Sequence, residues 1–176
     1  FGRAFSTGSV SDRVPVAEDR PFEDGVMADT KKVFIDGEAG TTGLQIRERL
    51  AAEPAIAVLS IAHDKRKDPQ ERQVLMAEAD VVVLCLPDDA AKDAVVLAAG
   101  LGAEAPKIVD ASTAHRVSSD WVYGFAELDA GQAGRIRAAA KVANPGCYPT
   151  GAIALLHPLV AAGVLPADHP ITINAV

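Results

Sequence analysis

The chain has 176 residues, with 17 basic and 24 acidic side chains and a formal net charge of −7. This acidic balance argues against a general nucleic-acid binder, which needs a basic surface, and no apolar run reaches the ~18 residues that span a bilayer. Two cysteines are too few for a disulfide scaffold, so we expect a reducing, cytoplasmic location. The length suits one domain, or one domain with part of a second.

The first thirty residues differ in character from the rest of the chain. They carry Gly, Ser, Pro and mixed charge without a periodic apolar pattern, and they hold 3 basic against 6 acidic residues. From Lys31 onward there are 14 basic and 18 acidic residues, so the remainder is only mildly acidic. We therefore interpret residues 1–30 as an extension outside the fold and expect it to be disordered.

From Lys31, short β-branched runs alternate with longer, alanine-rich amphipathic segments. Residues 111–128 are expected to be mostly loop, and Pro158 is expected to break or kink the last helix. The apolar pattern predicts strands at 33–35, 56–62, 81–86, 107–110 and 141–143. It predicts helices at 44–52, 69–77, 90–101, 129–140 and 147–156.

This strand–helix alternation indicates an α/β fold with a doubly wound, Rossmann-like parallel sheet. In such sheets, ligands lie beyond the carboxyl ends of the strands. The segments that follow the strands should therefore gather at one edge of the sheet. These segments are 37–43, 63–67, 86–89, 110–116 and 144–147.

The turn after the first strand holds Gly37, Gly40 and Gly43 at a G-x-x-G-x-x-G spacing, with Thr41 and Thr42 between the last two. Glycines permit a tight turn and let backbone N–H groups approach a pyrophosphate at the helix N-terminus. Because the loop follows the first strand of such a pattern, we predict that these residues bind a dinucleotide. The alternative is a tight strand-to-helix turn that holds no ligand.

The end of the second strand normally distinguishes the two nicotinamide cofactors. An acidic side chain there accepts the ribose 2′-OH, whereas Arg or Lys pairs with a 2′-phosphate. The loop here has three consecutive cations, Lys65, Arg66 and Lys67, which favour NADP(H). Asp64 leaves NAD as an alternative, and a solvated surface loop without a ligand is the third interpretation.

Cys147 follows a strand and a glycine turn and stands at the start of a predicted helix. The unpaired N–H groups and the positive dipole end of a helix favour the nucleophilic thiolate and can hold an oxyanion. We therefore predict nucleophilic catalysis by Cys147, with a small helix-capping residue as the alternative. Cys85 lies in an apolar strand pattern and is predicted to be an inert core residue.

The segment after the fourth strand should reach the same edge. Arg116 is suited to clamp a phosphate or carboxylate, and Ser112 or Thr113 to donate hydrogen bonds. His115 has acid–base chemistry, but a histidine in an exposed loop is more often without a catalytic role. No spacing of His, Cys and carboxylate residues indicates a metal site.

Four motifs stand out in chain order. They are the glycine loop from Gly37 to Gly43; Asp110-x-Ser112 with Arg116; Trp121-Val122-Tyr123-Gly124-Phe125-x-Glu127-Leu128; and Asn144-Pro145-Gly146-Cys147-Tyr148-Pro149-Thr150. Together they resemble the N-acetyl-γ-glutamyl-phosphate reductase family of arginine biosynthesis, in its shorter bacterial form. The resemblance covers residues 31–176, and the segment around Cys147 carries it most specifically.

The resemblance implies an oxidoreductase that uses NADPH to reduce N-acetyl-glutamyl 5-phosphate, a small acyl phosphate, to the semialdehyde with release of phosphate. Cys147 matches the nucleophile that forms a thioester. Asn144 and Arg116 match positions that hold the substrate phosphate, and Ser112 matches a further contact. The loop at Pro87 is expected along the cofactor, and the complete enzyme is expected to be a homo-oligomer.

The resemblance also divides the chain, into a dinucleotide-binding domain at 31–147 and the beginning of an α+β substrate and dimerisation domain at 148–176. Family members continue through a mixed sheet that supplies the acid/base histidine, and the resemblance implies that residues 171–176 form only the first strand of that sheet. We therefore expect this chain alone to be inactive or nearly so, and to expose apolar surface.

Other interpretations stay open. One is a related acyl-phosphate reductase, similar to aspartate-semialdehyde dehydrogenase or to a lysine-pathway enzyme. Another is a non-catalytic NADP-binding module that does not use Cys147. A thiol hydrolase is disfavoured because no histidine is placed as its triad base.

Overall fold

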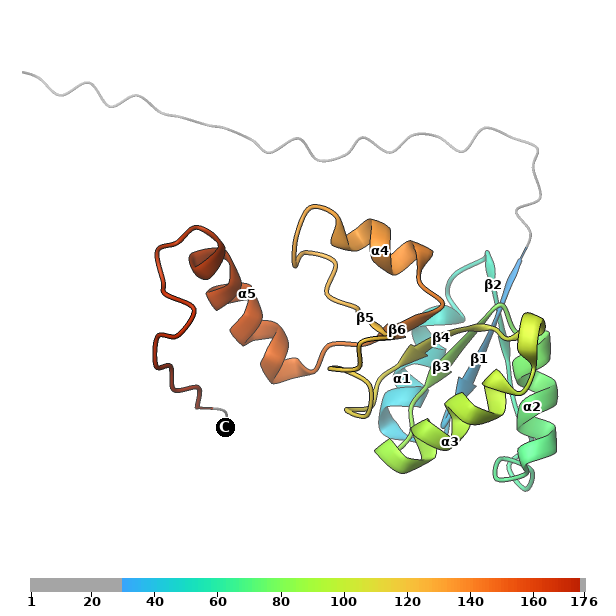
Figure 1. Ribbon diagram of the computed structural model, residues 1–176. Coiled ribbons are helices and arrows are strands. Elements are labelled where there is room, and N and C mark those ends of the chain that lie inside the picture. The colour runs from blue at the N-terminus through green and yellow to red at the C-terminus, as the bar shows by residue number, and fades with distance from the viewer. Residues whose placement is uncertain (1–29, 175–176) are drawn as a thin grey trace, which may run out of the picture.

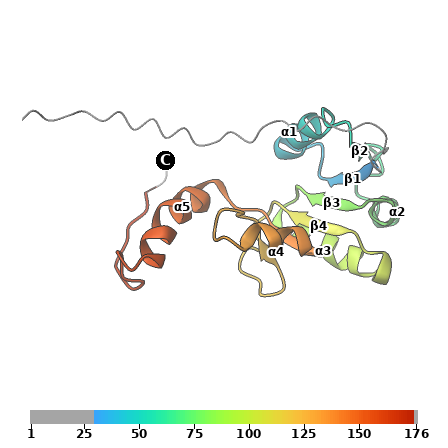
Figure 2. The same ribbon diagram turned by 90° about the horizontal axis from the view of Figure 1, so that it is seen from above.

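The computed structural model describes residues 30–174, and the disorder predicted for residues 1–30 lies, apart from Thr30, outside them. A parallel sheet runs through the molecule, with α1 on one face and α2 and α3 on the other (Figures 1 and 2). The strands are β1 (Lys31–Asp36), β2 (Ile56–Leu59), β3 (Val81–Leu84), β4 (Lys107–Asp110), β5 (Val122–Tyr123) and β6 (Lys141–Ala143). The helices are α1 (Thr41–Leu50), α2 (Pro69–Glu78), α3 (Asp88–Ala99), the 3-10 turn η1 (Gly102–Glu104), α4 (Gln132–Ala138) and α5 (Cys147–Ala161).

The strand order is β2-β1-β3-β4-β6-β5, and every pairing is parallel. The chain moves outward in one direction from β1 to β2, and in the opposite direction from β2 across β1 to β3 and on to β4. Because parallel crossovers are right-handed, this reversal places α1 on one face and α2 and α3 on the opposite face. The predicted doubly wound sheet is confirmed.

The core lies where the central strands meet α2 and α3. Phe34 of β1 and Val82 and Leu84 of β3 are fully buried, as is expected for strands covered on both faces. Met76 of α2 fills the space against them, and the alanines of α3 let that helix approach closely. α2 begins as predicted, because the Asp68 side chain accepts the N–H of Gln70 at 2.8 Å.

Apart from shifts of up to three residues in the bounds of other elements, three predicted elements differ from the structure. The expected loop 111–128 contains the two-residue strand β5, which is too short to show an alternation of apolar and polar residues in the sequence. α5 continues through Pro158 to Ala161, where a break or kink near residue 156 was expected. Ala154 and Pro158 are exposed, so the carbonyl that loses its N–H donor faces water and the cost of the proline is reduced.

The third difference is at the end of the chain. Residues 171–174 form no strand, contrary to the expectation for 171–176, and residues 175–176 lie outside the described range. A strand needs a neighbour for its backbone N–H and C=O groups. Within residues 30–174, the sheet ends at β5 and β2, and residues 171–174 pair with neither of these edge strands.

α5 projects away from the sheet (Figures 1 and 2) and has no buried residue. Leu155 and Leu159 on it, and Val164 after it, are exposed, which confirms the expected apolar surface. A small hollow of about 160 Å³ separates it from the 125–128 loop. Among the described residues, no helix has both the length and the apolar character needed to cross a membrane.

Candidate active site

The carboxyl ends of the strands are joined to one another beyond the regular sheet pairing. In each case, the N–H of the residue that follows one strand donates to the carbonyl of the last residue of the neighbouring strand. The bonds are Cys85 N–H to Asp36 O (2.8 Å), Ala111 N–H to Leu84 O (3.0 Å), Asn144 N–H to Asp110 O (2.8 Å) and Gly124 N–H to Ala143 O (2.8 Å). The loops predicted to gather at this edge are therefore held together by backbone contacts.

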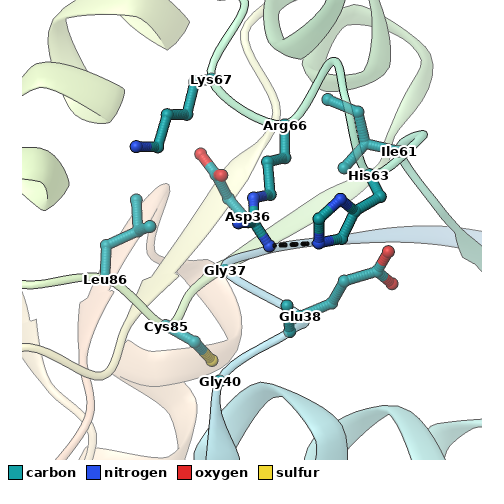
Figure 3. A pocket seen from close by; sticks show the side chains of 11 residues that line it. Asp36, Gly37, Glu38, Gly40, Ile61, His63, Arg66, Lys67, Cys85 and Leu86 are labelled. Atoms are coloured by element: carbon teal, nitrogen blue, oxygen red, sulfur yellow. Dashed lines mark hydrogen bonds between the residues drawn. The ribbon is translucent and has the colours of Figure 1, made fainter.

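A cavity of about 330 Å³ lies between the loops after β1, β2 and β3 (Figure 3). It is lined by Asp36, Gly37, Glu38, Ala39 and Gly40, by Ile61, His63, Arg66 and Lys67, and by Cys85 and Leu86. The lining combines residues of the glycine loop with residues of the loop 63–67 after β2, which we call the basic loop. The strand pattern predicts that these two loops lie at the same edge. Pro87, the N-cap of α3, follows Leu86 directly.

The glycine loop packs too closely for side chains at two positions. Gly37 has a φ of +94°, and a Cβ there would lie 2.3 Å from the carbonyl oxygen of Cys85. A Cβ on Gly43 would lie 2.4 Å from the carbonyl oxygen of Gly37. Because Leu44 makes the first helical bond, to Gly40 O at 2.9 Å, the N–H groups of Thr41, Thr42 and Gly43 form the open N-terminus of α1. This backbone cradle fits a pyrophosphate.

Both carboxylates of the cavity have cationic partners. Asp36 accepts two hydrogen bonds from the Arg72 guanidinium, at 2.6 and 3.0 Å. Burial raises the pKa of Asp36, and Arg72 opposes that rise. Glu38 pairs with Arg47 at 3.0 Å and accepts the Ser60 hydroxyl at 3.2 Å. Their negative charge is therefore balanced from α1 and α2.

The basic loop divides its cations between the cavity and the surface. Arg66 and Lys67 line the cavity, and within residues 30–174 neither makes a salt bridge. Arg66 Nη1 lies 2.9 Å from His63 Nε2, a lining residue whose role was not predicted (Figure 3). Lys65 instead bonds Glu71 of α2, and this hydrogen bond raises the pKa of Lys65. Lys65, which is predicted to bind the cofactor with Arg66, is not among the residues that line the cavity.

Cys147 is exposed and is the first residue of α5. Gly146 caps the helix, and its carbonyl accepts the N–H and the hydroxyl of Thr150, at 3.0 and 2.7 Å. Arg116 donates from Nε to Asn144 O at 3.2 Å, and a Cβ on Gly146 would lie 2.5 Å from Arg116 Nη1. The structure thus brings the predicted Arg116, Asn144 and Cys147 to one turn, with Gly146 making room for the guanidinium.

Ser112, predicted to contact the substrate, is buried and already engaged within its own loop. Its hydroxyl donates to Asp110 Oδ2 at 2.7 Å and accepts the Ala114 N–H at 3.1 Å. Thr113 bonds Asp88 at the start of α3 through its N–H, at 3.0 Å, and its hydroxyl. These bonds lower the pKa of Asp88 and tie the 110–116 loop to α3.

His115 is not the exposed loop residue that the sequence suggested, because only 12% of its side chain is accessible. Its Nδ1 lies 2.6 Å from Asp110 Oδ2, and its ring stacks on Trp121. Cys85 also departs from its predicted place: it follows β3 and lines the cavity. Burial raises the pKa of the Cys85 thiol to about 11, in keeping with the predicted inertness.

A family model described as semialdehyde dehydrogenase, NAD binding domain, matches residues 32–135. The chain belongs to this family, and it therefore contains a domain of the class that binds a nicotinamide dinucleotide. Two solved aspartate-semialdehyde dehydrogenases share the fold. The enzyme from Vibrio cholerae has a TM-score of 0.52 at 16% identity, covering 76% of this chain and 47% of that one. The enzyme from Candida albicans, solved with NADP, has a TM-score of 0.51 at 18% identity over the same shares.

The curated relatives agree with the resemblance found in the motifs. The N-acetyl-gamma-glutamyl-phosphate reductase of Rhizobium meliloti is 56% identical over 145 residues, which are 82% of this chain and 46% of that protein. The enzyme of the same name from Brucella ovis is 57% identical over the same shares. The predicted likeness to this reductase is confirmed, and the chain spans about half the length of the relatives it matches.

Proposed function

We propose that this chain supplies the cofactor site and the nucleophile of an NADPH-dependent N-acetyl-γ-glutamyl-phosphate reductase. The observation that carries the proposal is the position of Arg116, whose guanidinium packs against Gly146, the residue before Cys147. An anion clamp next to a thiol at a helix N-terminus suits an acyl phosphate, which presents a phosphate beside an electrophilic carbon. The complete enzyme is proposed to act in the cytoplasm, as a homo-oligomer.

The cavity fits NADP(H). The backbone cradle at Gly37, Gly40 and Gly43 suits the pyrophosphate, and the N-terminus of α1 at Thr41 and Thr42 adds its N–H groups. Both cavity carboxylates are paired, so Arg66 and Lys67 leave a net positive charge for a 2′-phosphate. When bound, the cofactor supplies the hydride that reduces the acyl group to the aldehyde. The match to a semialdehyde dehydrogenase NAD binding domain supports a nicotinamide cofactor in this cavity.

The thiol chemistry follows from the turn at 144–147. Sγ of Cys147 attacks the acyl carbon, a C–S bond forms, the C–O bond to the phosphate breaks, and phosphate leaves. Arg116 and Asn144 hold the phosphate, and the positive dipole end of α5 stabilises the oxyanion. His157 lies ten residues along α5, about 15 Å from Cys147 by helical rise, too far for direct proton transfer. We therefore expect acylation of Cys147 by this chain without efficient turnover.

The test is to incubate the 176-residue chain with N-acetyl-glutamyl phosphate and locate the acyl group by peptide mass spectrometry. We expect a thioester on Cys147, none in Cys147→Ser and an unchanged yield in Cys85→Ser. Faster acylation by aspartyl phosphate or by the lysine-pathway acyl phosphate would favour the sibling reductases. Binding of NADPH with no acylation by any of the three would favour the non-catalytic module.

The two thiols are predicted to differ strongly in alkylation. Since burial raises the pKa of Cys85 to about 11, its thiolate fraction at pH 8 is about one in a thousand, and its labelling should rise about tenfold per pH unit up to pH 11. The exposed Cys147 should react first with iodoacetamide at pH 7. Peptide mapping over a pH series measures both rates. Equal rates for the two thiols at pH 7 contradict the prediction.

Gly146→Ala is predicted to separate function from stability. The clash of the new Cβ is with the flexible end of Arg116, and the φ of −79° is ordinary, so unfolding should cost about 1 kcal/mol or less. The displaced guanidinium should slow acylation of Cys147 by about tenfold or more. Gly151→Ala is the control: a Cβ there has open space, so stability should hold or rise and acylation should not change. Equal acylation rates in the two variants contradict the prediction.

A further inference from the structure

We propose that Asp110 and His115 form a positioning pair that holds the guanidinium of Arg116 at the Asn144–Gly146 turn. This inference rests on the proposed function of Arg116 as an anion clamp beside Cys147. In this proposal, neither Asp110 nor His115 contacts the substrate or the cofactor. The pair acts through the loop that connects it to Arg116.

The first step is the burial of the Asp110 carboxylate. Within residues 30–174, its one ion-pair partner is His115 of the same loop, and no helix supplies an Arg or Lys to it. Asp110 at the end of β4 is fully buried. Its Oδ1 accepts the Ser112 N–H at 2.9 Å, and its Oδ2 accepts the Ser112 hydroxyl at 2.7 Å and His115 Nδ1 at 2.6 Å. A buried carboxylate is costly unless its oxygens are hydrogen-bonded, so the loop is constrained to supply these donors. The loop is thereby wound around Asp110.

The second step concerns the backbone carbonyls of Asp110 and Ala111, which connect this loop to Asn144 and to Arg116. The Asp110 carbonyl accepts the Asn144 N–H at 2.8 Å, and the Ala111 carbonyl accepts Arg116 Nη2 at 3.3 Å. Arg116 Nε donates to Asn144 O at 3.2 Å. The residues that hold the phosphate in the proposed function are thus both anchored on the backbone at Asp110 and Ala111.

The third step is the fixed orientation of the residue before Arg116. The His115 ring stacks on Trp121 with centroids 4.2 Å apart and planes 13° apart, while its Nδ1 bonds Asp110. Trp121 is itself buried, and Lys141 Nζ lies 5.8 Å from its ring centroid. Two contacts in different directions fix the His115 ring, and they set the direction in which the next residue leaves the loop. Arg116 is therefore directed to the turn before its substrate arrives.

The test compares alkylation of Cys147 by anionic iodoacetate and by neutral iodoacetamide, in the 176-residue chain. The ratio of the two rates reports a positive charge beside the thiol and cancels changes in the thiol itself. Arg116→Gln should lower the ratio about fivefold, the factor expected for one charge about 4 Å away in water. His115→Phe keeps a ring for Trp121 but loses the bond to Asp110, and should lower the ratio about two- to fivefold. His115→Asn keeps an N–H donor at the Nδ1 position and should retain the wild-type ratio.

The outcomes separate this inference from the proposed function. An unchanged ratio in Arg116→Gln refutes the anion clamp itself. A lowered ratio in Arg116→Gln with an unchanged ratio in folded His115→Phe leaves the clamp in place and overturns the positioning pair. A ratio lowered in folded His115→Asn also overturns it, since a hydrogen-bond donor to Asp110 would then not be enough to hold Arg116. Urea unfolding midpoints establish whether each variant folds. If His115→Phe does not fold, a wild-type ratio in His115→Asn supports the positioning pair, and a lowered ratio overturns it.

Discussion

Gly37→Ala is expected to lower the free energy of unfolding by more than about 3 kcal/mol and to abolish NADPH binding. Two separate costs add at this position. The φ of +94° is strained for any residue with a Cβ. The new Cβ would also lie 2.3 Å from the Cys85 oxygen and 2.9 Å from its carbonyl carbon. Both atoms belong to the backbone after β3, so relief of the clash requires movement of the loops that line the cavity.

Gly102→Ala separates the two costs. Gly102 has a φ of +60°, but a Cβ there meets nothing within 4 Å, so only the backbone strain applies. We expect a loss of about 1 kcal/mol and unchanged cofactor affinity. Urea denaturation of both variants and fluorescence titration with NADPH make the comparison. Equal losses of stability in the two variants would show that contact with Cys85 contributes little.

The strands of the fold were predictable because covered parallel strands are apolar on both faces. β4 and β6 have the predicted bounds, and β1 and β3 begin or end within two residues of them. β5 was missed because Val122 and Tyr123 are held by pairing with β6, a contact between distant segments. The continuation of α5 through Pro158 depends on exposure of that turn to water, which no local pattern reports.

The candidate site was predictable at the level of backbone turns. The glycine loop and the turn before Cys147 lie where strand ends place them, and Arg116 reaches the second of these as expected. The partners of the side chains were not predictable. Whether a lysine faces a cavity or a glutamate, and whether a histidine is exposed or stacked, is decided by residues far away in sequence. Lys65 and His115 are the two examples.

Arg66→Ala is expected to raise the Kd for NADPH by about thirty- to a hundredfold, equivalent to about 2–3 kcal/mol, and to leave the Kd for NADH within about twofold. Arg66 lines the cavity, lies 2.9 Å from His63 and forms no salt bridge within residues 30–174, so its guanidinium is available to a 2′-phosphate. NADH lacks that phosphate and gains nothing from this charge. The proposed NADPH preference therefore depends chiefly on this side chain, with Lys67 beside it.

Lys65→Ala is the matched control, because it removes a neighbouring cation of the same loop. The Lys65 ammonium bonds Glu71 and is absent from the cavity lining, so its loss should change the Kd for NADPH by less than about threefold. Fluorescence titration of both variants with both cofactors gives the four constants. A larger effect from Lys65 than from Arg66 would place the phosphate outside the cavity, on the α2 side of the loop. Equal weakening of NADPH and NADH by Arg66→Ala would show that the arginine shapes the cavity and does not select the phosphate.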